Sequence, residues 1–265
     1  MLSGVIMQLR AFVLLYADTC VLMDKKEFLI IMENKVFSCV TDLVSVLENT
    51  QQENIEKAAR LFADSLEKGG MLQAFGSGHS QSGASELCFR AGGFIPTKQI
   101  KEPAGGAYEG IEGVGTMFMQ KVDVRENDVV VLISNSGRNP LPIEIAIEAK
   151  KKGAKVVTIT SLESSKTLTS KHSSGKLLHE FADVAIDNCV MEGDASIELE
   201  GLDTRICGMS AITTAVLIQA IVYRTAEIMI AEGTVPPVFK SQNIDGGAEY
   251  NDRLRAAFFD RMFHM

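Results

Sequence analysis

The sequence predicts an α/β fold built on a parallel sheet, and three observations lead to it. Residues 129–133, 140–152 and 155–160 read as a strand, a helix and a second strand. Both strands are rich in Val and Ile, as expected for parallel strands that are covered on both faces. Hydrophobic residues make up 46% of the 265 positions, which is enough to fill the core of one sizeable domain.

The other elements follow from the spacing of apolar residues along the chain. Apolar residues three and four positions apart mark the predicted helices, and short unbroken apolar runs mark the predicted strands. Before residue 129 the elements are helices over 33–48 and 51–68, a strand over 71–75, a helix over about 80–91 and a short strand over 94–96. After residue 160 they are a short helix over 177–182, a strand over 184–186, a long apolar helix over 208–232 and a final helix from Ala248.

Two segments between these elements read as loops. Residues 101–116 are dense in glycine, which is typical of a functional loop rather than of a core element. Residues 162–176 are polar and rich in serine, and we expect them to be mobile. Neither segment is expected to contribute to the core.

The main functional signal is a pair of Ser/Gly loops, each placed between a strand and a helix. The first Ser/Gly loop comprises residues 76–83 and follows the strand over 71–75; the second comprises residues 134–139 and follows the strand over 129–133. Glycine lets the backbone approach a ligand closely, free N–H groups at the start of a helix attract anions, and serine hydroxyls donate without adding charge. Two such loops at the carboxyl edge of one parallel sheet predict a phosphate site.

Three well-known motifs are incomplete in the first Ser/Gly loop. A dinucleotide fingerprint needs a third glycine where Gln81 stands, and a P-loop needs a lysine where Ala84 stands. A hydrolase nucleophile elbow around Ser80 needs a glycine in place of Ser82. We therefore predict no nucleotide or other cofactor.

The composition disfavours several classes of protein. A formal net charge of -8 repels nucleic acid, and no run reaches the about 20 apolar residues that a membrane-spanning helix needs. The five cysteines include no C-x-x-C pair, which is typical of reduced thiols in a cytoplasmic protein. The four histidines are too scattered along the sequence to indicate a metal site.

The first 31 residues stand apart from the rest of the chain. They are apolar but interrupted by charges, and they lack the basic start and cleavage site of a signal peptide. The amphipathic pattern begins only at Glu33. We therefore expect Met32 to be the natural start and residues 1–31 to be an extension.

Taken together, the motifs resemble those of the SIS (sugar isomerase) family of phosphosugar-binding domains. The resemblance rests on G-S-G-H-S after the strand over 71–75, S-N-S-G after the strand over 129–133, and K-K-G-A-K-V-V-T-I-T-S across 151–161. It spans about residues 34–265, so we place the domain at 32–265. It implies a five-stranded parallel sheet with helices on both faces, a doubly wound, flavodoxin-like three-layer sandwich, and homodimers or higher oligomers that share active sites. The phosphate ligands that we predict are Gly76, Ser77, Gly78, Ser80, Ser134, Asn135, Ser136, Gly137, Arg138, Thr160 and Ser161.

Two local features refine this resemblance. The chain resembles bacterial SIS proteins labelled as phosphoheptose isomerases, but a true member carries a His in its late helix. The helix over 208–232 offers Gln219, Tyr223, Arg224 and Glu227 there, and no His. The run 109–112 (E-G-I-E) is similar to a segment of the N-acetylmuramic acid 6-phosphate etherases, whose second Glu is a catalytic acid or base and maps onto Glu112.

Glu86, Glu112 and His79 are the candidates for acid/base catalysis, and His172 is a further group to consider. Aldose–ketose isomerisation needs a base to move a proton between C1 and C2 and an acid at the carbonyl oxygen, and ether elimination begins with the same proton abstraction. Glu86 lies one to two turns into the helix after the first Ser/Gly loop, and Glu112 lies in the glycine-dense loop. His79 can protonate a ring oxygen or bind a sugar hydroxyl, and His172 can enter from a partner subunit.

Three functions stay open at this point. The first is an isomerase or epimerase acting on a phosphorylated hexose or aminosugar. The second is a lyase or etherase acting on an N-acetylated aminosugar phosphate. The third is a sensor that binds a phosphosugar without catalysis. We expect the first, with a phosphosugar as ligand and with no nucleic acid or membrane as partner.

Overall fold

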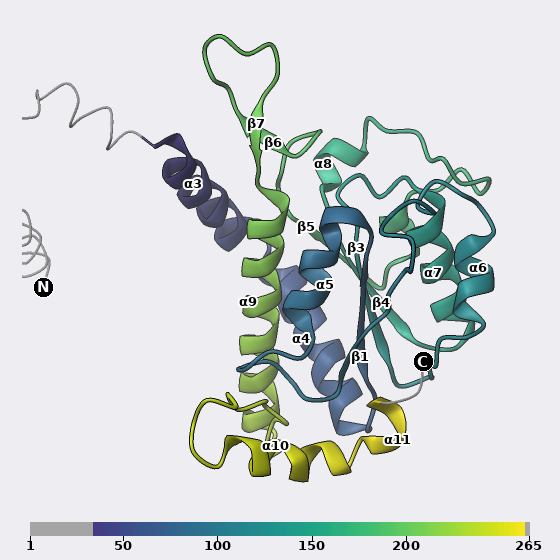
Figure 1. Ribbon diagram of the computed structural model, residues 1–265, viewed down its shortest axis with the longest axis vertical. Coiled ribbons are helices and arrows are strands. Elements are labelled where there is room, and N and C mark those ends of the chain that lie inside the picture. Colours follow the sequence, from purple (N-terminus) through teal and green to yellow (C-terminus); the bar gives the residue numbers. More distant parts are fainter. Residues whose placement is uncertain (1–33, 263–265) are drawn as a thin grey trace, which may run out of the picture. The chain divides into compact units, whose positions relative to one another are not determined.

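The computed structural model describes residues 34–262. The chain divides into two units after Ser38, and of the first unit the structure describes only residues 34–38. The extension expected over residues 1–31 therefore lies outside the described residues. The second unit is an α/β sandwich of three layers (Figure 1).

The central layer is a sheet of five parallel strands, which confirms the predicted fold class. The strand order is β2-β1-β3-β4-β5, and all four pairings are parallel. The strands are β1 (Leu72–Gly76), β2 (Thr97–Gln99), β3 (Val129–Ile133), β4 (Lys155–Thr160) and β5 (Val184–Asp187). The helices are α3 (Lys35–Thr50), α4 (Gln52–Glu67), η1 (Gly78–Ser80), α5 (Gln81–Leu87), α6 (Val114–Met119), α7 (Pro140–Lys151), α8 (Leu162–Ser165), η2 (Leu178–Phe181), α9 (Ser210–Ala231), α10 (Gly247–Ala256) and α11 (Phe259–Met262).

The side chains of β3 divide between two cores, one on each face of the sheet. Val129, Val131 and Ile133 pack with residues of α4, α5 and α9. Val130 and Leu132 pack with residues of α6 and α7 on the other face. This alternation is what a strand buried on both sides requires, since successive side chains point to opposite faces. Figure 1 shows the two helical layers on either side of the strands.

The order of the strands reverses between β1 and β3, and this reversal positions the site. The chain leaves β1 into α5 on one face and leaves β3 into α7 on the other face. The two connections therefore diverge and open a crevice at the carboxyl ends of these neighbouring strands, which is where ligands bind in folds of this kind.

Most predicted elements are confirmed, and the exceptions have local causes. The strands over 129–133 and 155–160 are found as predicted. Helix α5 ends at Leu87 rather than near residue 91, because the backbone is extended at Cys88 and left-handed at Phe89, with φ 58°. The strand predicted over 94–96 is wrong: the strand that pairs with β1 is Thr97–Gln99, and Phe94 forms only an isolated bridge to Val238.

Four short elements have no counterpart in the sequence analysis. Helix α6 begins inside the glycine-dense segment, and helix α8 lies in the serine-rich segment that was predicted as a loop. A short antiparallel hairpin of β6 (Ala195–Ile197) and β7 (Ile206–Gly208) precedes α9. The sequence patterns of such short elements are too brief to show a period.

Helix α9 is the one helix among the described residues that is long and apolar enough to cross a bilayer by length and composition. This is weak evidence for a membrane span, since much of the helix is buried in the core against α4 and a core helix of a soluble protein passes the same test. The four described cysteines, at 39, 88, 189 and 207, are free thiols. Burial raises the pKa of Cys88 to about 12.

Candidate functional site

The first Ser/Gly loop turns sharply out of β1 and leaves one hydroxyl without a partner. A Cβ at Gly76 would lie 2.1 Å from the carbonyl oxygen of Ser80, so only glycine fits there. Ser77 follows and is 7% exposed, and its Oγ is buried without a hydrogen-bond partner. Because a buried hydroxyl without a partner costs free energy, such a group is a candidate for contacting a ligand.

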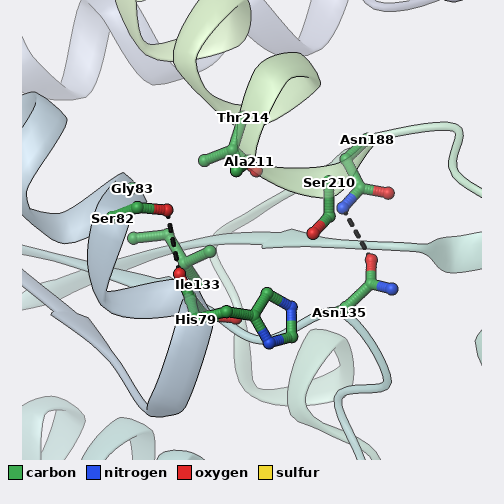
Figure 2. Close-up of a pocket in the computed structure, with 10 residues that line it drawn as sticks. His79, Ser82, Gly83, Ile133, Asn135, Asn188, Ser210, Ala211 and Thr214 are labelled. Atoms are coloured by element: carbon green, nitrogen blue, oxygen red, sulfur yellow. Dashed lines mark hydrogen bonds between the residues drawn. The ribbon is translucent and has the colours of Figure 1, made fainter. Parts of the chain in front are cut away.

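The second Ser/Gly loop is braced by the strands next to it. The main-chain carbonyl of Asn135 accepts hydrogen bonds from the Ser161 N–H at 2.9 Å and the Thr160 hydroxyl at 3.2 Å. The Asn135 side-chain Oδ1 accepts one from Asn188 Nδ2 at 2.8 Å (Figure 2). These bonds tie the loop after β3 to the ends of β4 and β5, so its shape is fixed before any ligand arrives.

This braced loop keeps donors free at its tip. Within the described part of the chain, the main-chain N–H groups of Ser136, Gly137 and Arg138 have no acceptor. The Nε of Arg138 is also buried without a partner. Gly137 has φ 60°, and consecutive N–H groups around such a residue form a concave nest that binds anions. The tip therefore offers both N–H donors and a positive charge.

The start of α7 does not provide the free N–H groups that we expected from a helix N-terminus. Pro140 and Pro142 have no N–H, and the Leu141 N–H donates to the carbonyl of Glu109 at 3.2 Å. The donors available to an anion on this side thus come from the loop itself and not from the helix.

Thr160 and Ser161 were predicted as phosphate ligands, and their hydroxyls are already engaged. The Thr160 hydroxyl donates to Asn135, and the Ser161 hydroxyl contacts Ser164 Oγ at 2.8 Å and the carbonyl of Val190. Both residues are buried. In this arrangement they support the second Ser/Gly loop rather than face a ligand.

The two loops line one recess at the carboxyl edge of the sheet. Its cavity is about 10 Å³, room for one water molecule, so a sugar would lie at its mouth. Figure 2 shows the residues that line it together with Ser80, namely His79, Ser82, Gly83, Ile133, Asn135, Asn188, Ser210, Ala211 and Thr214.

His79 lies at the rim of this recess and faces a carboxylate that the sequence did not single out. Its Nε2 lies 3.5 Å from Asp194 Oδ2. Asp194 also accepts hydrogen bonds from the N–H groups of Met209 and Ser210, at 2.9 and 2.7 Å, and thereby caps the start of α9. No local pattern marks Asp194, because its partners lie beyond the β6–β7 hairpin. The imidazole is thus held beside a charge at the exposed side of the site.

Glu86 lies along the seam between α5 and α9, about one turn beyond the recess. Gln219 of α9 donates to its carboxylate at 2.7 Å, and Arg90 forms an ion pair with it. The Glu86 side chain is partly buried. The amide of Gln219 and the guanidinium of Arg90 fix the orientation of this carboxylate.

Glu112 lies on the other side of the sheet, in the glycine-dense loop. Its carboxylate accepts hydrogen bonds from the hydroxyl and the N–H of Ser173, which hold its pKa below the ordinary value of 4.5. His172 of the same chain lies 3.6 Å from it. His172 therefore lies beside Glu112 of its own chain.

The glycine-dense loop covers the first Ser/Gly loop at one point. A Cβ at Gly106 would lie 3.2 Å from the Gly78 nitrogen and 3.4 Å from Ser77 Oγ. Glycine permits this approach, and the φ of Gly106, 100°, also favours it. The loop thus packs its backbone directly against the unpartnered hydroxyl of Ser77.

Comparisons with known proteins identify the family. Residues 37–161 match the SIS domain. The chain is 50% identical over 229 residues to the UPF0309 protein of Listeria monocytogenes, which covers 86% of this chain and 98% of that relative. It is 36% identical over 240 residues to a UPF0309 protein of a Geobacillus species, covering 87% of this chain and 97% of the relative. The chain belongs to the UPF0309 family of SIS-domain proteins.

A solved structure shows the same fold. A phosphoheptose isomerase from Francisella tularensis superposes with a TM-score of 0.52 over 77% of this chain and 100% of that chain, at 14% identity. At this identity the likeness concerns the fold alone, and the site must be judged from its own residues.

Proposed function

We propose that this protein binds the phosphate of a phosphorylated hexose or aminosugar between the two Ser/Gly loops. The observation that supports this most is that both loops carry donors without partners and follow β1 and β3, which are neighbouring strands of the sheet. Ser77 contributes a buried hydroxyl, and residues 136–138 contribute free N–H groups and the Arg138 side chain. Phosphate has several strong acceptor oxygens, so it satisfies such a set better than a neutral group does.

The reaction that fits this site is isomerisation or epimerisation with Glu86 as the base. Moving a proton between neighbouring carbons of a sugar needs a carboxylate held in a fixed orientation near the anchored substrate. Gln219 and Arg90 hold Glu86 in this way, on the same seam as the recess. A phosphoheptose isomerase shares this fold, but the late helix here carries Gln219 and Glu227 and no His, so the proposal rests on the residues of this site.

A second candidate is the elimination of an ether from an N-acetylated aminosugar phosphate, with Glu112 as the base. The side chain of Glu112 is 42% exposed and its pKa is lowered, so it is ionised at neutral pH. Its loop contacts the first Ser/Gly loop through Gly106. The two candidates differ in which carboxylate the reaction needs.

The test is a panel of sugar phosphates and aminosugar phosphates. Thermal-shift measurements come first: a ligand at 100 times its dissociation constant adds about 2.7 kcal/mol to stability, which raises the melting temperature. Each ligand that binds is then followed by proton NMR in deuterated water. Isomerisation exchanges a carbon-bound proton for deuterium, and elimination releases the ether group.

The outcomes separate the hypotheses. Exchange that Glu86→Gln abolishes supports the isomerase, whereas release that Glu112→Gln abolishes supports the etherase. Binding without either reaction supports the non-catalytic sensor. A complete panel without a thermal shift contradicts phosphosugar binding itself. The homodimer and the cytoplasmic location expected from the sequence stay predictions, the first testable by analytical ultracentrifugation.

A further inference from the structure

Three side chains from separate segments converge beside the second Ser/Gly loop. They are Glu112 of the glycine-dense loop, Glu144 of α7 and His172 of the segment after α8. One ligand atom from each lies within 4.8 Å of the other two. The isomerase proposed above uses none of these groups.

The distances between these atoms suit a shared ion. His172 Nε2 lies 3.6 Å from Glu112 Oε1 and 3.9 Å from Glu144 Oε1. Two donors of a tetrahedral ion with bonds of about 2.1 Å lie roughly 3.4 Å apart. Small side-chain rotations therefore bring the three atoms to the spacing that one ion requires.

The charges of the cluster are unbalanced. Among the described residues, no Lys or Arg forms an ion pair with Glu112 or Glu144. Burying a charge costs more free energy at Glu144 than at Glu112, because the Glu144 side chain is only 4% exposed. The N–H groups of Gly113 and Thr116 offset part of this cost by donating to its carboxylate. A divalent cation would balance the two carboxylates.

The His172 side chain is prepared for such a role. It is 10% exposed, and its Nε2 faces the carboxylates. Its Nδ1 accepts a hydrogen bond from the Ser174 main-chain nitrogen at 3.1 Å and lies 2.8 Å from Ser174 Oγ. In a neutral ring with this hydrogen bond, the proton is on Nε2. Metal binding would move the proton to Nδ1, where the Ser174 hydroxyl can accept it, and free the Nε2 lone pair.

We propose that Glu112, Glu144 and His172 bind one divalent transition-metal ion, and that Zn²⁺ fits them best. An imidazole with two carboxylates is a ligand set for zinc and its neighbours, whereas Mg²⁺ and Ca²⁺ prefer oxygen alone. The exposed side of Glu112 leaves room for a water as fourth ligand.

Binding of the ion would stiffen one wall of the phosphate crevice. The segment that carries His172 donates two main-chain hydrogen bonds to the second Ser/Gly loop, one from before His172 and one from after it. The Lys171 N–H binds the carbonyl of Arg138, and the Leu178 N–H binds that of Gly137, each at 2.8 Å. The ion would join this segment to α7 and to the glycine-dense loop, so it acts as a clamp around the site.

The test uses the full chain after removal of metals with a chelator. Titration calorimetry with Zn²⁺ is expected to show one ion per chain, and His172→Ala is expected to weaken binding by about 100-fold or more. His179→Ala is the matched control, because it removes another imidazole outside the cluster, and it is expected to bind as the wild type does. Visible absorption of Co²⁺-loaded protein reports directly on the coordinating ligands.

A second variant guards against misfolding. Glu112→Gln changes an exposed residue and is expected to weaken Zn²⁺ binding while the metal-free melting temperature stays close to that of the wild type. The proposal is overturned if the wild-type protein binds no Zn²⁺, because the three side chains then form only a hydrogen-bonded cluster. It is also overturned if His172→Ala binds Zn²⁺ as tightly as the wild type does. A sugar-phosphate thermal shift in metal-free protein tests the proposed function separately.

Discussion

The two Ser/Gly loops have similar sequences, but the structure gives their polar groups different surroundings. In the first Ser/Gly loop the Ser77 hydroxyl is buried without a partner, and the backbone of Gly106 lies against it. In the second, Asn135 is bound by groups from β4 and β5, and only the tip keeps free donors. Hydroxyls that look equivalent in sequence therefore divide into those without a partner, such as Ser77, and those that hold the loop in place, such as Thr160.

The largest effect on turnover is expected at Glu86, which lies in the helix that follows the first Ser/Gly loop. Glu86→Gln keeps the shape of the side chain but removes the base, so turnover of a sugar phosphate is expected to fall about 100- to 10,000-fold. Binding of the same ligand is expected to persist, measured by thermal shift. Glu163→Gln, an exposed carboxylate of α8, is the control. Unchanged turnover in Glu86→Gln would remove this residue from the mechanism.

A matched pair of serines tests the comparison itself. Ser77→Ala is expected to weaken phosphosugar binding about 10- to 100-fold, because a hydrogen bond to a charged group contributes about 1.5–3 kcal/mol. It leaves the stability of the free protein unchanged or higher, since the hydroxyl has no partner there. Affinity is measured by calorimetry and stability by chemical denaturation.

Ser161→Ala is expected to give the opposite result. It removes one of the two hydroxyls that bind the Val190 carbonyl, together with the contact to Ser164, and the loss of a hydrogen bond costs about 0.5–1.5 kcal/mol of stability. Ligand affinity is expected to change less than in Ser77→Ala. If the two variants behave alike, the division of the hydroxyls into two kinds is wrong.

A smaller effect is expected where the glycine-dense loop meets the first Ser/Gly loop. Gly106→Ala places a methyl group 3.2 Å from the Gly78 nitrogen and is expected to weaken ligand binding a few-fold by moving the two loops apart. Gly105→Ala is the control: Gly105 also has a positive φ, of 62°, but nothing lies within 4 Å of its Cβ position. Equal affinities for the two variants, measured by calorimetry, would show that this contact does not shape the site.

The smallest effect is a pH dependence of the tether between Glu112 and Ser173. Hydrogen bonding to Ser173 lowers the pKa of Glu112 below 4.5, so the stabilisation is complete above pH 4.5 and is lost as the pH falls through the lower value. The difference in stability between wild type and Glu112→Gln, measured by denaturation in chelator, is expected to vanish in acid. A difference that grows on acidification would mean that the pKa is raised instead.

The fold could be predicted because its signals are local. The strands β3 and β4 are rich in Val and Ile, and strands of this composition are buried on both faces of a parallel sheet. The strand over 94–96 was misplaced because its position depends on pairing with β1 and not on its own composition. Leu72 pairs with Thr97, one residue after Pro96.

The site could be predicted only in part, because its decisive contacts join distant segments. The Ser/Gly loops carry a local signal and do line one recess. Whether a hydroxyl is free is set by neighbours that no local pattern reveals, as with Ser161 and Val190. Glu144 lies among the buried residues of α7, and only the fold brings it to His172.

Calorimetry with a matched pair of ligands, one sugar phosphate and the same sugar without its phosphate, tests the central claim most directly. The account predicts that the phosphate improves affinity about 100-fold or more, and that a Ser77→Ala/Arg138→Ala double variant loses most of this preference. Equal affinity for the two sugars, or a preference that the double variant keeps in full, would contradict it.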